Sequence, residues 1–417
     1  MLLGRVAAVA LFSALVGWGC APGTPVPQAT LFRGARIITG DARPPIENGA
    51  FLVTNGRITR VDTAVRLTPA SGQTIIDLRG KTIMPAIVDG HSHLGYTNVA
   101  AGTTEASNYT RDNLLDHLRR YAYYGVAATL SMGLDRGELP YQLRSETTAD
   151  AARFLTAGRG IAMPNAGPRA AYWRDAAYGV TTEAEARAAV RELAARKIDF
   201  VKIWVDDRDK TVTPLPPSLY GPIIDEAHAH SLRVIAHMFY LADAKALLRA
   251  DIDGFAHGIR DKDLDDEILA LFRQRPQVFV MPNLPDTPAG ATARPPLWAV
   301  QARNLPKLAA ASVIIGFGTD AGVGAPYGLG AHEELADMVA AGLTPMQAIV
   351  AATSTTAGIL RLHDLGAIAE GKSADFIVLD ANPLEDIGNT RRIAQVYLRG
   401  TRVNREQLRA QWTDVTP

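Results

Sequence analysis

The feature that most constrains the fold is an alternation of short apolar runs with helical stretches between residues 87 and 362. Eight such runs occur: "AIVDGHSH", "GVAATLSMG", "FLTAGR", "DFVKIWV", "RVIAHMF", "DIDGFAHGI", "VFVMPNL" and "VIIGFGTD". One intervening stretch, "TTEAEARAAVRELAARK", has a capping-box pattern at Thr182 and Glu185 followed by one apolar stripe. Strands that alternate with helices indicate parallel βαβ units, and eight units predict an α/β fold of the TIM type, a (β/α)8 barrel. An open, doubly wound sheet is the alternative, but no Gly-x-Gly-x-x-Gly follows the first run.

The segments on either side of the barrel have a different pattern. Residues 31–84 and 363–417 contain short β-branched runs interrupted by Gly, Pro and Asn-Gly. Neither segment alone has enough strands for a stable sheet. We therefore predict a small β-sandwich domain built from both chain ends, with residues 85–362 forming the catalytic barrel.

The N-terminus resembles a bacterial export signal. Residues 1–20 contain Arg5, then the apolar run 6–16, then small residues before Cys20, the only cysteine of the chain. This run is too short to span a bilayer, and residues 21–30 form a Pro-rich tether. We expect an exported protein, either periplasmic or anchored to the membrane as a lipoprotein through Cys20.

Charge composition gives no reason to expect a polyanionic partner. The chain has 43 basic and 43 acidic side chains and no polybasic run, which argues against nucleic-acid binding. A small-molecule substrate fits better, and the oligomeric state, including a homo-oligomer, is left open.

Five side chains of types that bind metals, and one lysine in an apolar run, lie within or at the ends of these runs. They are His91, His93, His237, His257 and Asp320, with Lys202 as the lysine. The carboxyl ends of barrel strands meet at one face, where active sites assemble. Lysine inside an apolar strand is costly unless its charge is neutralised or used. The sequence therefore predicts a metal site at this face. His228 and His230 sit two apart on a helix, point in different directions and cannot share an ion.

The chain resembles the amidohydrolase superfamily over nearly its whole length after the export signal. The resemblance is carried by "GRITRVD", "IDLRGKTIMPAIVDGHSHL", "VKIW", "VIAH", "FAHG", "GTDAG", "LTPMQAIVAATSTTAGIL" and "LGAIAEGKSADFIVLD". More narrowly, it is similar to imidazolonepropionase-like and prolidase-like members whose fourth-strand ligand is lysine. Ala86 departs from the glycine usual after Pro85 but touches no predicted ligand.

The resemblance implies two divalent ions, with zinc expected. His91, His93 and Asp320 would hold one ion, and His237 and His257 the other. Lys202, carboxylated by CO2, would bridge both ions together with a hydroxide. Asp320 would then act as general base and acid in the cleavage of an amide or other C–N bond.

The substrate is not specified by these motifs. A dipeptide, an N-acyl amino acid or a cyclic amide fits, and so does a lactone, ester or phosphotriester. The candidate substrate-binding residues follow strand ends and comprise Trp173, Arg174, Arg208, Tyr240 and His332. The alternative that is not an enzyme is an exported lipoprotein that binds a ligand without catalysis. A metal site that had lost its catalytic function would be expected to lack at least one ligand, and all six positions are filled.

Overall fold

The computed structural model describes residues 29–284 and 296–412. The predicted export signal, Cys20 and most of the tether lie outside the described residues, so export and lipid attachment stay predictions. Within those two ranges no helix is long and apolar enough to cross a membrane.

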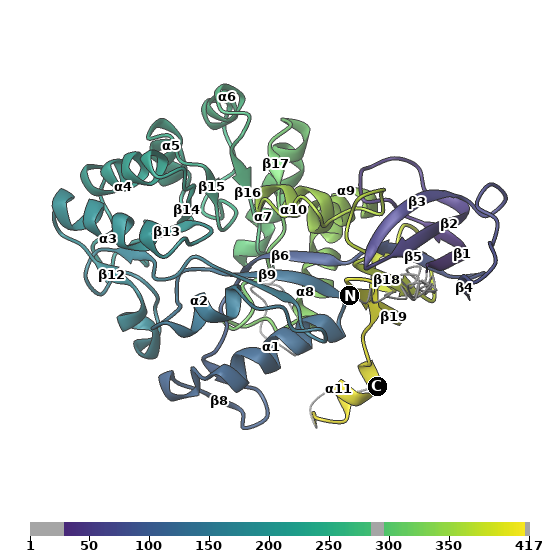
Figure 1. The fold of residues 1–417 in the computed structure, drawn as a ribbon. Coiled ribbons are helices and arrows are strands. Elements are labelled where there is room, and N and C mark those ends of the chain that lie inside the picture. Colours follow the sequence, from purple (N-terminus) through teal and green to yellow (C-terminus); the bar gives the residue numbers. More distant parts are fainter. Residues whose placement is uncertain (1–28, 285–295, 413–417) are drawn as a thin grey trace, which may run out of the picture.

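Strands from both chain ends form one eight-stranded sheet, in the order β20-β19-β18-β5-β1-β2-β3, with β4 beside β1. Their bounds are β1 (Thr30–Ile37), β2 (Ile46–Thr54), β3 (Arg57–Thr63), β4 (Thr74–Asp77), β5 (Thr82–Pro85), β18 (Phe376–Leu379), β19 (Ile393–Leu398) and β20 (Thr401–Arg402). The two ends meet where β5 pairs antiparallel with β18, Met84 opposite Ile377. Figure 1 shows this sheet as a separate lobe in which the purple and yellow ends of the chain lie together.

The interior of this β domain is built on aromatic rings. Phe32 stacks on Phe51 with ring centroids 5.0 Å apart, and Phe376 stacks on Tyr397 at 4.6 Å. The two pairs meet edge to face, Phe32 lying 5.0 Å from Phe376. One aromatic pair comes from each end of the chain, so neither end could build this core alone.

The eight runs predicted as barrel strands are strands in the structure. They are β6 (Ile87–Ser92), β9 (Val126–Ser131), β10 (Arg153–Thr156), β13 (Val201–Trp204), β14 (Val234–His237), β15 (Gly254–Phe255), β16 (Phe279–Val280) and β17 (Ile314–Ile315). Neighbouring strands are parallel. Backbone bonds from Gly90 N to Phe317 O (2.9 Å) and from Asp199 N to Thr156 O (2.9 Å) join the two parallel sheets into a closed ring.

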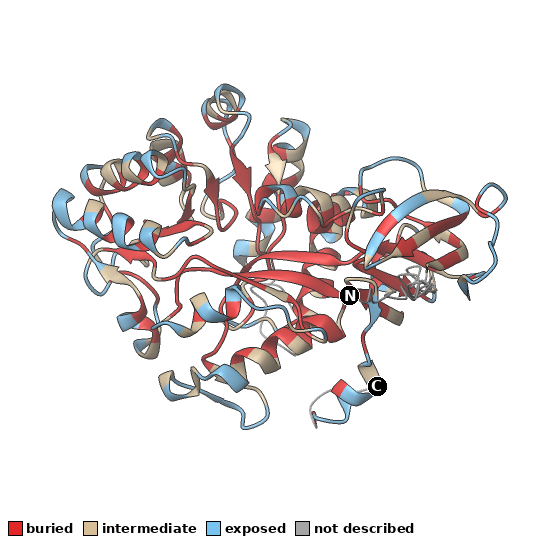
Figure 2. Cartoon of the chain, in the orientation of Figure 1, coloured by how far each residue is buried: buried red, intermediate tan, exposed pale blue. Residues whose placement is uncertain are grey.

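Helices alternate with these strands and surround them. They are α1 (Arg111–Tyr123), α2 (Leu139–Arg144), α3 (Glu183–Ala195), α4 (Pro217–Ala229), α5 (Leu241–Arg249), α6 (Asp266–Gln274), α7 (Pro296–Ala310) and α8 (Leu329–Ala340). The predicted capping box at Thr182 and Glu185 starts α3, which buries its apolar stripe. In Figure 2 the central strands are buried, whereas the helices are buried on one side and exposed on the other. The fold is the predicted (β/α)8 barrel with a β domain.

Candidate metal centre and cavity

Five of the six predicted side chains come from strand ends, and the sixth lies within a strand. His91 belongs to β6 and His93 follows it directly, so the two-residue period of the strand carries both rings to the same side. Lys202 lies in β13, His237 ends β14, and His257 and Asp320 follow β15 and β17. Five of the six thus lie at or beyond the carboxyl ends of their strands, and Lys202 is the second residue of β13.

His91, His93 and Asp320 meet around one carboxylate oxygen. Nε2 of His91 lies 3.3 Å and Nε2 of His93 lies 3.0 Å from Oδ1 of Asp320. One ligand atom from each residue falls within 4.8 Å of the others. Oδ1 of Asp320, Nε2 of His91 and Nδ1 of His93 are buried without a hydrogen-bond partner in the described part of the chain. Buried polar atoms normally have partners, so Nε2 of His91 and Oδ1 of Asp320, which lie 3.3 Å apart, are available to a shared ligand such as a metal ion.

The charge states of this group suit a cation. Burial, together with the nearby Lys202, lowers the pKa of His91 well below its usual value, which keeps the imidazole neutral and able to coordinate. Burial opposes ionisation of Asp320, but His91 and His93 outweigh it and hold the pKa of the carboxyl below its usual range. The site therefore combines the neutral imidazole of His91 with an ionised carboxylate.

His237 and His257 form a second pair beside the first group. Nδ1 of His237 lies 2.9 Å from Nε2 of His257, and the His91 and His257 ring centroids are 5.1 Å apart. Nε2 of His237 lies 3.7 Å from Asp206 Oδ2. Burial lowers the pKa of His237 to about 4 and that of His257 well below its usual value. Two neutral imidazoles with facing nitrogens are suited to binding one ion.

Lys202 is buried among these groups, with its side chain 1% exposed overall. Its Nζ has no hydrogen-bond partner among the residues that the structure describes, and it lies 5.5 Å from the centroid of the Trp204 ring. Burial lowers the pKa of Lys202 to about 7. An amine held in this way is partly neutral near physiological pH.

Other buried groups orient the predicted ligands. Nδ1 of His91 lies 3.0 Å from the Ala256 carbonyl and 3.2 Å from Oδ1 of Asn283. Asp89 accepts hydrogen bonds from the backbone N–H of His91 (3.1 Å) and from Thr319 Oγ1 (2.6 Å). Sequence reasoning missed Asp89, although its position two residues before His91 was a usable signal. Carboxylates and carbonyls behind metal-binding histidines fix ring orientation.

A cavity of about 280 Å³ opens beside these side chains. Its lining includes His93, His237, His257 and Asp320, and it is completed by Leu134, Gly167, Pro168, Arg169, Trp173, Trp204, Asp206, Arg208, Phe239, Arg260 and Val323. Of the five predicted substrate-binding residues, Trp173 and Arg208 line it. Trp204 was missed, yet it lies two residues after Lys202 on the same strand face, which was a readable signal.

Arg174, Tyr240 and His332 do not line this cavity, and a substrate-binding role for them stays a prediction. Arg174 is exposed. The Tyr240 hydroxyl is engaged by Asp207 Oδ1 at 3.0 Å. His332 is buried on α8, where its Nε2 lies 2.9 Å from the Tyr124 carbonyl. A position shortly after a strand end did not reveal which way each side chain turns.

The lining of the cavity includes three arginines, Arg169, Arg208 and Arg260, which we call the cationic wall. Nη2 of Arg208 is buried and lacks a hydrogen-bond partner within residues 29–284 and 296–412. Burial lowers the pKa of Arg208, Asp206 opposes that shift, and the like charges of Arg169 and Arg174 add to it. A ligand with negative charge would relieve this repulsion.

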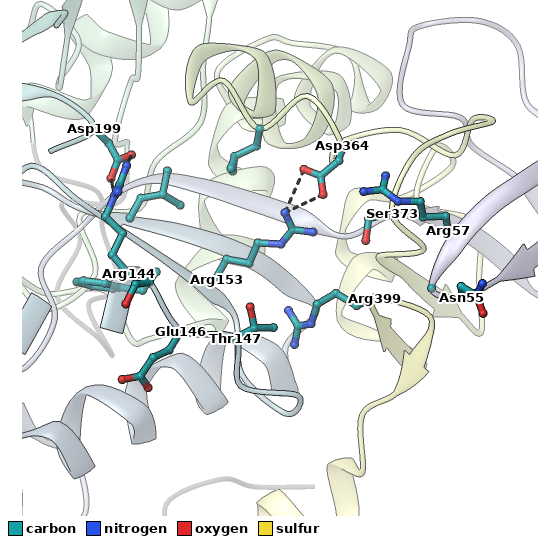
Figure 3. A pocket seen from close by; sticks show the side chains of 15 residues that line it. Asn55, Arg57, Arg144, Glu146, Thr147, Arg153, Asp199, Asp364, Ser373 and Arg399 are labelled. Atoms are coloured by element: carbon teal, nitrogen blue, oxygen red, sulfur yellow. Dashed lines mark hydrogen bonds and ion pairs between the residues drawn. The ribbon is translucent and has the colours of Figure 1, made fainter. Parts of the chain in front are cut away.

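A larger cavity of about 560 Å³ lies where the β domain meets the amino ends of the barrel strands. Figure 3 shows its arginines, which come from both domains. Arg144 binds Asp199 through two bonds of 2.8 and 2.7 Å, and Arg153 lies 2.9 Å from Asp364. Arg399 donates to the Thr148 carbonyl at 2.7 Å. These charges are satisfied within the chain, so this cavity is a joint between domains.

Comparison with known proteins agrees with this geometry. The model of the amidohydrolase family matches residues 82–403. An uncharacterised protein of Mycobacterium tuberculosis is 30% identical over 361 residues, covering 82% of this chain and 90% of the relative. Ochratoxinase of Aspergillus niger is 26% identical over 413 residues, with 86% and 83% covered. The solved structure of a candidate prolidase from Bifidobacterium longum has a TM-score of 0.77 at 25% identity and covers 93% of this chain and 99% of that one.

Proposed function

The chain belongs to the amidohydrolase family and is a hydrolase acting on C–N bonds, and from that premise we propose that it cleaves amides whose amine half carries a carboxylate. N-acyl amino acids and dipeptides are the substrate class. The observation that carries the proposal is the juxtaposition, in one cavity, of metal-binding atoms and Arg208 Nη2, all of which lack hydrogen-bond partners among the described residues.

The donor set fits divalent ions, which the family generally binds. We assign His91, His93 and Asp320 to one ion and His237 and His257 to a second, with zinc the metal expected from nitrogen-rich ligands. The buried, unpartnered Nζ of Lys202 supports its assignment as a carboxylated lysine shared by both ions. When bound, such ions polarise a carbonyl and lower the pKa of water.

The chain's own residues account for proton transfer. Asp320 has its Oδ1 directed at His91 and His93, while its side chain remains 24% exposed and borders the cavity. A carboxylate in that position can take a proton at the cavity and return it to a leaving nitrogen. Asp320 is therefore the proposed general base and acid.

Substrate orientation is assigned to the cationic wall. Arg208 can bind a carboxylate through two parallel N–H donors, and Arg169 lines the same wall. Trp173, whose ring centroid lies 6.0 Å from that of His93, forms an apolar side of the cavity. The scissile amide would lie between the histidines and the arginines.

A substrate panel tests the proposal. Metal-loaded protein should hydrolyse N-acyl amino acids or dipeptides, and Asp320→Asn should lose at least about 100-fold in kcat. Lactones, esters and phosphotriesters serve as the competing panel, because the same metal chemistry acts on them. Preferential turnover of that panel would overturn the amide assignment.

A further inference from the structure

Three consecutive non-glycine residues after β13 adopt a left-handed backbone. The φ angles are 51° at Arg208, 56° at Asp209 and 65° at Lys210. In this region Cβ crowds the following carbonyl, so single residues other than glycine are uncommon and a run of three is energetically uphill. Surrounding contacts must hold such a turn in place.

The side chains of Tyr240 and Asp207 help to hold the turn, together with the Thr211 hydroxyl, which donates to the Arg208 carbonyl at 2.7 Å. The Tyr240 hydroxyl donates to Oδ1 of Asp207 at 3.0 Å and accepts from the backbone N–H of Asp209 at 3.3 Å. The same Asp207 oxygen accepts from the backbone N–H of Lys210 at 3.2 Å. One phenol, brought by the residue before α5, thus ties together both ends of the turn. We call Tyr240 and Asp207 the latch.

The turn presents Arg208 to the cavity. Oδ1 of Asp206 accepts from the backbone N–H of Arg208 at 3.1 Å, which fixes where its side chain starts. The guanidinium then lines the cavity and leaves Nη2 buried and unpartnered among the described residues. Tyr240 itself does not line the cavity, so it can affect a ligand there only through the turn.

We propose that Tyr240 is a positioning residue, which through the latch holds Arg208 over the cavity to bind the substrate carboxylate. The identity of the anion rests on the proposed function. The position of Arg208 does not, because it follows from the contacts of the turn. Removing the Tyr240 hydroxyl should therefore weaken carboxylate binding while leaving the chemistry intact.

Calorimetric titration of metal-loaded protein with L-leucine, the carboxylate-bearing product of N-acetyl-L-leucine cleavage, separates binding from turnover, because this ligand is not consumed. Tyr240→Phe and Arg208→Gln should each weaken binding about tenfold. The double variant should bind no more weakly than Arg208→Gln alone, because the two residues act in series. Adding Lys210→Gly to Tyr240→Phe should restore part of the affinity, since glycine adopts the left-handed conformation without strain.

Turnover supplies a second readout. With N-acetyl-L-leucine, Tyr240→Phe should raise KM about tenfold and keep kcat within about twofold. With N-(3-methylbutyl)acetamide, which lacks only the carboxylate, the variant should match the wild type. Thermal unfolding of Tyr240→Phe should stay close to that of the wild type, which excludes general misfolding.

Several outcomes would overturn the positioning role. Unchanged binding in either single variant would do so, as would an equal loss of kcat on both compounds, which would place Tyr240 at the reacting group. Tight binding without hydrolysis of any amide by wild-type protein is a different result. It would reject the proposed function and leave the effect of Tyr240 on Arg208 to be decided by calorimetry.

Discussion

The two ends of the barrel both gather charged side chains, but the arginines described above are paired with carboxylates only at the amino end. At the amino end, Arg144 and Arg153 are paired with Asp199 and Asp364. At the carboxyl end, Lys202 Nζ and Arg208 Nη2 are buried without partners among the described residues. Paired charges between domains stabilise an arrangement, whereas unpaired buried groups cost free energy and persist where a ligand will bind them. This difference supports the placement of the proposed site in the smaller cavity.

Removing the amine at the carboxyl end should have the largest effect. Lys202→Ala should lower kcat/KM by about 100- to 1,000-fold, which corresponds to about 3–4 kcal/mol of lost transition-state stabilisation. Bound metal, measured by elemental analysis, should fall from about two ions per chain. Bicarbonate or a short carboxylic acid should restore part of both.

Lys202→Arg is the matched control for that experiment. Guanidinium keeps its charge and cannot form a carbamate, so small acids should not rescue this variant. Wild-type turnover with two ions in Lys202→Ala would remove Lys202 from the site.

Removal of the metal ions by a chelator should have the second largest effect, and it should act at the carboxyl end of the barrel. If metal binds only the folded protein, removing it from conditions about 1,000-fold above the Kd should lower the free energy of unfolding by about 4 kcal/mol. Denaturant melts with and without chelator measure this. The variants His237→Ala and His257→Ala should respond less to chelator. An identical response would show that these histidines hold no ion.

Acidification should destabilise the protein through buried histidines that belong to neither charged end. Burial lowers the pKa of His117 and of His332 to about 4. Between pH 6.5 and 4 the unfolded chain binds protons that the folded chain does not, so stability is full above pH 6.5 and falls as the pH falls. Each histidine should contribute about 2–3 kcal/mol to that loss.

Urea melts from pH 7.5 to 4.5 on metal-free protein check this dependence. His332→Asn should flatten the curve relative to wild type, since one titrating group is gone. If the pH dependence of the free energy of unfolding is unchanged by the substitution, protonation of His332 does not contribute to acid destabilisation.

The smallest effect is expected at the amino end. Arg153→Ala should lower the free energy of unfolding by about 1 kcal/mol, because its bridge to Asp364 is partly exposed. Its kcat should be unchanged. Arg57→Ala, at an exposed residue whose Nη1 bonds the Gly371 carbonyl, is the control and should change stability by less than about 0.5 kcal/mol. A loss of kcat in Arg153→Ala would make the joint part of the functional site.

The sequence was sufficient for the features that follow from periodicity. The eight apolar runs are the eight barrel strands, and alternation along β6 placed His91 and His93 together. The sequence was insufficient to predict the direction of an individual side chain in a loop or on a helix. Tyr240 turns to Asp207 and His332 to the Tyr124 carbonyl, and both choices depend on neighbours distant in the sequence. Arg169 and Arg260 reach the cavity from loops, for which no repeat predicts a direction.

The pairing of β5 with β18 also determines when the β domain can be completed during synthesis. A ribosome releases the first strands long before Phe376–Leu379 exist, so β5 must wait with an open edge while the barrel is made. Unpaired edges of this kind recruit other chains. A product truncated before residue 376 would keep all six predicted ligands yet leave that edge exposed, and we expect it to aggregate. The last strands of the chain therefore complete the sheet and protect the protein from aggregation.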